Sequence, residues 1–205
     1  MKKYELLVED DNGLYRIRAL KDFSNVKAGD LGGFVEYESN LSHYGNCWVY
    51  DNAKVFANAY ISGGACVYEN AKVFGDAKVY GDCWVYGRAQ VSDDAQVFGN
   101  AEVFGNARVF GDCWVLGDAE VFGDCWVYGD AQMSGNARVF GNAEVYGTAR
   151  VYGNAEVFGN SWVFGTAQVY GTAQVSGHAW VSGDAWVYGT AQVFGNAEVT
   201  SGIKI

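Results

Sequence analysis

The stretch GDCWVLGDAEVFGDCWVYGDAQ, residues 111–132, starts the same six-residue unit four times. The unit is G-[ND]-A-x-V-[FY], and it runs from Gly45 to Thr200 as 26 consecutive hexads without an insertion or deletion. Its fifth position is Val except at Ile61 and Met133, and its third position is Ala except where Cys or Ser replaces it. A repeat this regular decides the fold before any other feature is considered.

The chemistry of the hexad predicts a coil of short parallel strands. Along A-x-V-[FY] the side chains alternate, so Ala and Val share one face of an extended strand. The following Gly takes positive φ freely, and Asn or Asp tolerates it, so the next two residues form a corner. Since every hexad turns in the same direction, Ala and Val face inward and each strand pairs with the one a full coil later. Helix is excluded, because Gly in every unit of six would interrupt any helical stripe.

The hexad resembles the repeat of left-handed parallel β-helix proteins, and it is similar to that of the YdcK-like β-solenoid repeat family. The similarity extends to LKDFSNVKAGDLGGFVEYESNLSHYGNCWVYDNA, residues 20–53, which looks like the N-terminal cap of that family. The left-handed coil and the triangular section of three hexads per coil are implied by this resemblance. Proteins of this kind are often described as acyltransferases by analogy, but a fold does not determine a function.

The two ends of the chain differ from the repeat. YELLV and LYRIRAL flank EDDNG near the N-terminus, and Asp-Asn-Gly between two apolar runs indicates a β-hairpin. A solenoid needs a capped end, so we predict a hairpin and loop cap over residues 1–32 and an all-β solenoid over residues 33–205. The C-terminal SGIKI continues the frame, with Ile203 in an Ala slot and Ile205 in a Val slot. We expect these two residues to meet another copy of the protein.

Composition narrows the classes of protein and partner. The 205 residues include 28 Gly, no Pro and five Cys, and the net charge is -10. This charge disfavours binding to nucleic acid or an anionic membrane through a general basic field. No run of eighteen apolar residues predicts a membrane span, and acidic residues interrupt the first ten positions, so no signal peptide is expected. An odd number of cysteines fits reduced thiols, and we predict a cytoplasmic protein.

A coil of three hexads places residues eighteen apart in vertical columns, separated by about 4.8 Å. One edge then carries a ladder of aromatic side chains, which includes Phe104, Phe122, Phe140 and Phe158 and starts at Tyr50, Tyr68 and Tyr86. A second edge carries Tyr80, Phe98, Leu116, Ser134, Tyr152, Tyr170 and Tyr188. On one wall the outward slots hold Trp126, Trp162 and Trp180, interrupted by Glu144. The rings either brace the corners by packing or form a docking surface for a partner, and both interpretations stay open.

An acidic column is the main candidate for a metal site. The corner slots Asp76, Asp94, Asp112 and Asp130 stack at coil spacing and repel one another unless something offsets their charge. Asp at a corner usually accepts hydrogen bonds from backbone amides. The alternative is a row of Ca²⁺ sites, since Ca²⁺ takes carboxylate and carbonyl oxygens. No other cofactor is expected.

The candidates for catalysis are few. Cys47, Cys83, Cys113 and Cys125 replace the inward Ala, so we interpret them as small core residues rather than metal or redox groups. The hexapeptide acyltransferases that the chain resembles use a histidine base at a subunit interface, often beside a loop thrown out from the coil. No loop interrupts the 26 hexads here, and His178 is the one candidate base. It fits more readily as a substitute in a column of Asn residues.

Three hypotheses follow from the sequence. The first is a non-catalytic scaffold or binding module that presents aromatic and acidic ladders to a protein partner or to another copy of itself. The second is a trimeric acyltransferase that uses His178 and binds acyl-CoA between protomers. The third is an acidic decoy protein, of viral or bacterial origin, that occupies a nucleic-acid-binding protein.

Overall fold

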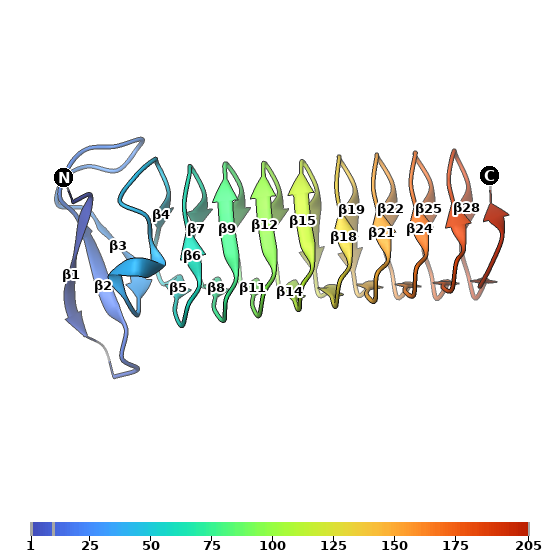
Figure 1. Cartoon of the computed structure of the whole chain (residues 1–205), viewed down its shortest axis with the longest axis horizontal. Helices are drawn as coiled ribbons and strands as arrows, with labels where there is room; N and C mark the ends of the chain where they lie inside the picture. The colour runs from blue at the N-terminus through green and yellow to red at the C-terminus, as the bar shows by residue number, and fades with distance from the viewer. Residues whose placement is uncertain (1, 10, 205) are drawn as a thin grey trace.

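The computed structural model describes residues 2–9 and 11–204 as a parallel β-solenoid that follows an N-terminal hairpin (Figure 1). Three sheets form its walls. The 26 hexads contribute nine strands to two of them and eight to the third, where β30 adds a ninth, so the chain makes about nine turns. The described residues contain no α-helix and only one 3₁₀ turn, η1 (Glu38–Asn40). The predicted all-β parallel solenoid is confirmed, and the three-walled coil is consistent with a left-handed β-helix. Within the described residues no helix is long and apolar enough to cross a membrane.

The first wall, wall A, also carries the N-terminal hairpin. Its strands, in order across the sheet, are β1 (Tyr4–Glu9), β2 (Tyr15–Ala19), β3 (Leu31–Val35), β5 (Lys54–Val55), β8 (Lys72–Val73), β11 (Gln90–Val91), β14 (Arg108–Phe110), β17 (Trp126–Tyr128), β20 (Glu144–Val145), β23 (Trp162–Val163), β26 (Trp180–Val181) and β29 (Glu198–Val199).

The other two walls consist of repeat strands, with β30 added at the end of wall C. Wall B contains β4 (Trp48–Val49), β7 (Cys66–Val67), β10 (Trp84–Val85), β13 (Glu102–Val103), β16 (Glu120–Gly123), β19 (Arg138–Gly141), β22 (Glu156–Val157), β25 (Gln174–Val175) and β28 (Gln192–Val193). Wall C contains β6 (Tyr60–Ile61), β9 (Lys78–Gly81), β12 (Gln96–Gly99), β15 (Trp114–Gly117), β18 (Gln132–Met133), β21 (Arg150–Val151), β24 (Gln168–Val169), β27 (Trp186–Val187) and β30 (Ile203–Lys204).

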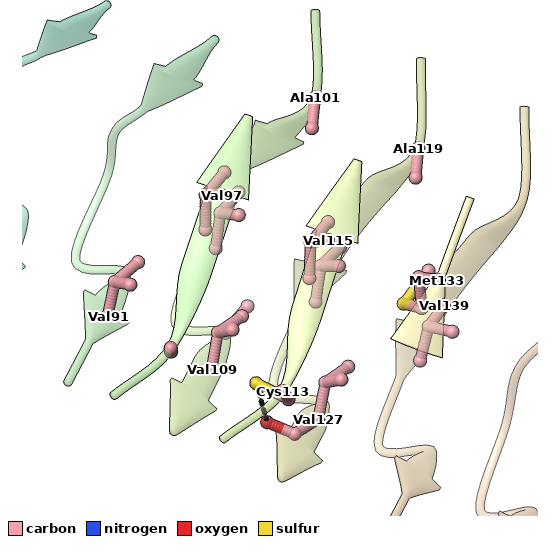
Figure 2. Close-up of a cluster of buried hydrophobic side chains, with 14 of the residues drawn as sticks. Val91, Val97, Ala101, Val109, Cys113, Val115, Ala119, Val127, Met133 and Val139 are labelled. Carbon is pink, nitrogen blue, oxygen red and sulfur yellow. Dashed lines mark hydrogen bonds between the residues drawn. The ribbon is translucent and has the colours of Figure 1, made fainter. Parts of the chain in front are cut away.

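The register of the repeat is eighteen residues, as the three-hexad coil requires. Val103 lies opposite Val121, and the same offset joins Trp84 to Glu102. The Ala and Val columns form one continuous core whose side chains are almost all fully buried. Figure 2 shows part of it, with Val97 and Val115 in successive turns of one wall. Stacking identical small side chains in this way leaves no space that another element must fill.

The corners depend on glycine at the first slot of each hexad. Gly123 has φ +86, and a Cβ there would lie 2.9 Å from the backbone nitrogen of Gly141 in the next turn. Four hexads place another residue in this left-handed conformation: Asp51, Ala57, Glu69 and Asp93. The two Asp side chains offset the strain, because each accepts a hydrogen bond from the next turn. Asp93 Oδ2, for example, accepts from the backbone N–H of Gly111 at 3.1 Å.

The cap joins the solenoid through β3. This strand pairs antiparallel with β2 and parallel with β5, so it ends the cap sheet and starts the first turn. Phe34 lies opposite Lys54, an offset of 20 residues, whereas Trp48 lies opposite Cys66 at the usual 18. The first turn is therefore two residues longer than the others. The fully buried Trp48 packs under the cap loop, with its ring 5.3 Å from that of Phe23.

The expected frame of the last residues is wrong by one position. Ile203 lies opposite Trp186 rather than Ala185, and the backbone N–H of Trp186 donates to the carbonyl of Gly202. The corner before β30 is thus one residue shorter than the others. We attribute this to Ser201, which stands at the slot where the repeat requires the positive φ that glycine adopts freely. Ile205 and the side chain of Ile203 lie outside the described residues, so their expected role in self-association remains a prediction.

Candidate functional site

The aromatic ladder predicted at the edge between walls B and A is present. The rings of Phe104 and Phe122 lie 4.8 Å apart and within 3° of parallel, and Phe140 and Phe158 continue the stack at 4.9 Å. Arg138 on β19 places its guanidinium 5.3 Å from the ring centre of Phe122 and 5.4 Å from that of Phe140. The protein's own cation therefore covers the middle of this ladder.

Arg138 is also the centre of a charged row on wall B. Its guanidinium lies 3.1 Å from Glu120 and 3.3 Å from Glu156, in the turns before and after it. These pairs are exposed enough to be screened by solvent and salt, so their contribution to stability is small. They nevertheless hold the guanidinium over the phenyl rings, which leaves this surface partly occupied by the chain itself.

The ladder between walls C and B is interrupted, as its sequence predicts. Tyr80 stacks on Phe98 at 4.8 Å, and Tyr152 and Tyr170 stack at 4.8 Å on the far side of Leu116 and Ser134. A third ladder lies between walls A and C. It is not among the predicted columns, although the same eighteen-residue count reveals it. Its stacked rings include Phe110, Tyr128, Tyr146 and Phe164.

The three tryptophans expected on one face do lie on wall A, but they do not form one patch. Trp162 and Trp180 stack in parallel with ring centres 5.1 Å apart, and Trp180 is 41% exposed. Glu144 lies between Trp126 and this pair in the sheet. Trp126 instead packs edge-on against Phe110 and Tyr128 of the third ladder.

The predicted binding residues thus divide between two walls. Phe104 and Phe158 directly follow strands of wall B, and Phe122 and Phe140 are the last residues but one of such strands. Arg138 of wall B packs over two of these rings. The tryptophans extend outward from wall A. We call the stacked pair Trp162 and Trp180, with Glu144 before it and Glu198 after it on the same wall, the tryptophan face.

The acidic column stands at the corner that leads into wall C. Asp76, Asp94, Asp112 and Asp130 are all exposed, and Asp76 accepts a hydrogen bond from Asn58 Nδ2 at 2.9 Å. Among the residues that the structure describes, no group of three or more His, Cys, Asp or Glu side chains is placed to hold a metal ion. Side chains of other corner columns bond along the coil in the same way, as Asn106 does to Asp124 at 2.8 Å. The corner amides and carboxylates therefore link successive turns.

His178 occupies an exposed corner position. Its backbone N–H donates to the carbonyl of Gly195 at 2.7 Å, as the corner residues before it do. Its imidazole has no hydrogen-bond partner among the described residues, and the strands on either side continue the repeat without a loop. The geometry provides neither an orienting group for a general base nor an enclosed site around it.

The inward cysteines are core residues. Cys113 is fully buried, and its thiol donates to the carbonyl of Val127 at a sulfur–oxygen distance of 3.6 Å (Figure 2). Burial raises the pKa of the Cys113 thiol to about 12, and it does the same for Cys83 and Cys125. These thiols stay protonated at neutral pH, so they are not poised for nucleophilic or metal chemistry.

Cys47 differs because it contacts a buried lysine that the sequence does not reveal. Lys3 belongs to the cap and is fully buried where the cap meets the first turn. Its Nζ lies 2.8 Å from the carbonyl oxygen of Cys47 and 3.2 Å from the sulfur of Cys47. The ring of Phe23 lies 5.0 Å from the same nitrogen. Burial lowers the pKa of Lys3 and raises that of Cys47. A lysine two residues from the start of a chain is ordinarily a solvated group, so no sequence signal indicates this contact.

Comparison with known proteins supports the assignment of the repeat. It gives no evidence for a specific activity. The family model described as the YdcK β-solenoid repeat matches residues 131–147, 149–165 and 173–189. These stretches lie in the C-terminal half, where the first slot of each hexad is glycine. No curated protein matches the chain.

Proposed function

We propose that this chain is a non-catalytic scaffold that presents stacked aromatic and acidic side chains to a protein partner. The observation that supports this most strongly is the tryptophan face. Two parallel indoles are held at 5.1 Å by adjacent strands of one sheet, and Trp180 is 41% exposed. Tryptophan is enriched among the residues that dominate binding energy at protein interfaces.

The surroundings of the two indoles favour a basic partner. Glu144 precedes them on wall A and Glu198 follows them, and the whole chain carries a net charge of -10. An arginine or lysine side chain laid over an indole gains a cation–π attraction, and the flanking carboxylates add a charge interaction. The negative field of the chain also speeds the approach of a basic surface. A second copy of this acidic chain is a poorer electrostatic match.

The wall behind the tryptophans is rigid, which suits a scaffold. Trp162 and Trp180 stand on β23 and β26, and the backbone of each strand is bonded to its neighbours on both sides. Little side-chain or backbone freedom is lost when a partner binds such a surface, so more of the contact energy appears as affinity. The proposal also includes a cytoplasmic location, which is supported by five cysteines that are all free thiols.

The test uses the full chain as bait in the cell from which it comes. We compare wild type with a Trp162→Ala/Trp180→Ala double variant, and Trp186→Ala serves as the matched control. Trp186 is 44% exposed on wall C and lies only one strand further along the chain. We expect a partner that wild type and the control capture equally and the double variant captures at least tenfold less.

Light scattering of the purified proteins accompanies the capture experiment. A wild-type dimer that the double variant converts to a monomer would identify a second copy as the occupant instead of a basic partner. If all three baits capture the same proteins in the same amounts and remain monomeric, the tryptophan face is not a binding surface. No described geometry favours the acyltransferase, because His178 is exposed and lacks an orienting partner.

A further inference from the structure

A cavity of about 520 Å³ opens on wall B, where the cap loop meets the first turns of the solenoid. Its lining includes three aromatic residues, Tyr50, Tyr68 and Trp84, and two acidic residues, Asp51 and Asp82. Trp84 is 47% exposed, so its indole stands at the mouth rather than in the core. The cavity lies at the opposite end of the solenoid from the tryptophan face.

Tyr50 and Tyr68 start the ladder between walls B and A, but the rings around this cavity do not form a parallel stack with one another. From Tyr68 onward the ladder stacks in parallel, and Tyr68 and Tyr86 lie within 2° of parallel. Tyr50, in contrast, is turned by 87° relative to Tyr68, with ring centres 6.4 Å apart. Trp84 meets Tyr68 at 73° and 6.3 Å. The three rings therefore form walls set at steep angles to one another, as in a box, instead of a continuous stack.

The turned ring is held by the cap. Tyr50 Oη donates to Asn25 Oδ1 at 2.8 Å, and Asn25 belongs to the cap loop that also lines the cavity. Burial raises the pKa of Tyr50 to about 12 and that of Tyr68 likewise, so both phenols are neutral at physiological pH. A neutral phenol keeps the electron-rich ring face that attracts a cation.

A break in the repeat makes room for one of the carboxylates. Gly64 is the only glycine at the second position of a hexad, where Asn and Asp predominate. A Cβ at this position would collide with Asp82 Oδ1, so the carboxylate occupies the space that another side chain would fill. Neither Asp82 nor Asp51 forms an ion pair within the described part of the chain. The cavity thus combines ring walls with two carboxylates, of which Asp51 also accepts a hydrogen bond from the backbone N–H of Glu69.

We propose that this cavity binds an alkylated ammonium group, either as a small choline-like molecule or as the methylated lysine of a peptide. Such a cation has a delocalised charge and an apolar surface, so it interacts more favourably with aromatic ring faces than with water. The carboxylates contribute a favourable charge interaction without the need for a hydrogen bond. The site is distinct from the tryptophan face, and its existence does not depend on the function proposed above.

The ligand class is tested by titrating the full chain with choline and with 3,3-dimethylbutan-1-ol, its neutral isostere, by calorimetry and tryptophan fluorescence. We expect choline to bind at least tenfold more tightly than the neutral compound, and we expect its affinity to fall as salt is added. A trimethyllysine peptide and its unmethylated form are titrated in parallel, and the tighter of choline and methylated peptide identifies the source of the ammonium group. Equal binding of charged and neutral isosteres, or no binding of either cation, would overturn the proposal.

Substitutions of the cavity lining test whether choline binds in the cavity. Trp84→Ala is expected to reduce choline affinity at least tenfold, and Asp82→Asn severalfold with the rings intact. Trp114→Ala is the matched control, because Trp114 is 43% exposed on wall C and meets Phe98 edge-on at 6.4 Å. Circular dichroism checks that each variant folds. If Trp114→Ala weakens binding as much as Trp84→Ala, or if Asp82→Asn binds choline as tightly as wild type, the cavity is not the site.

Discussion

The capped end and the regular turns of the solenoid differ in how closely they follow the hexad repeat. From β13 to β29 the turns keep one register, with small and aliphatic side chains buried inside and glycine at the first slot of each corner. Around the cap the pattern breaks: the first turn has two extra residues, Lys3 is buried and the ring of Tyr50 is turned. The cavity lies at these irregularities. Uniform stacking leaves little room for hollows, so a chain of this type is expected to form a cavity where it departs from its own repeat.

The same contrast appears in backbone strain. All four first slots that lack glycine, Asp51, Ala57, Glu69 and Asp93, lie in the first half of the solenoid. From Gly99 to Gly195 each first slot is glycine. The N-terminal turns therefore carry strain that the C-terminal turns avoid, and hydrogen bonds to side chains of this region accompany it. One example is the backbone N–H of Ala57, which donates to Glu36 at 2.6 Å.

The largest expected effect tests the regular region. Val115 is fully buried between Val97 and Met133 of the neighbouring turns. Val115→Asp buries an unpaired charge and should lower the free energy of unfolding by roughly 4 kcal/mol, measured by chemical denaturation. Val115→Ile is the control and should cost under about 1.5 kcal/mol, because Ile and Met already occur in this slot. Similar losses for the two variants would mean that the interior is not packed as described.

Alkaline pH should distinguish buried thiols from the alanine that they replace. The folded pKa of Cys113, about 12, exceeds the ordinary value of 9.0, so the folded state keeps a proton that the unfolded state loses above pH 9. Stability should fall as pH rises from 9 towards 12. Cys113→Ala should remove about 1 kcal/mol of the loss between pH 8 and pH 10 and leave stability at pH 7 nearly unchanged. An identical decline in wild type and variant would show that this thiol ionises freely in the folded state.

The smallest effect tests strain at the corners. Ala57 has φ +55, and Ala57→Gly should raise the free energy of unfolding by roughly 0.5 kcal/mol, because glycine tolerates this conformation. The reverse change at an equivalent corner, Gly105→Ala, should cost more than about 1 kcal/mol. Its Cβ would lie 2.9 Å from the backbone nitrogen of Gly123. Denaturation curves that show both substitutions to be neutral would contradict the role assigned to the first slot.

The regular part of the fold is predictable because it follows from local chemistry repeated many times. Counting eighteen residues from Val103 correctly places Val121 beside it, and the same count from Trp162 finds Trp180. The same count also places Phe110 beside Tyr128, a ladder that the predicted columns did not include.

The irregular part depends on contacts between distant segments, and no pattern in the sequence encodes them. The burial of Lys3 requires the cap to fold over Cys47, 44 positions away. The extra residues of the first turn and the shortened corner at Ser201 change the register only where neighbouring strands meet. The cavity was missed for the same reason, although Gly64 marks it as the one hexad with glycine at its second position.

The central claim is that eighteen residues advance the coil by one strand. Pulsed electron resonance between spin labels on wall C measures this directly, with Cys66 replaced by Ala so that the introduced thiols are the reactive ones. Lys78 and Gln168 are five strands apart, and Tyr60 and Gln168 are six. The two label pairs should report backbone separations of about 24 Å and about 29 Å, one strand spacing apart. Two equal distances, or a shorter one for the pair that starts at Tyr60, would contradict the coil.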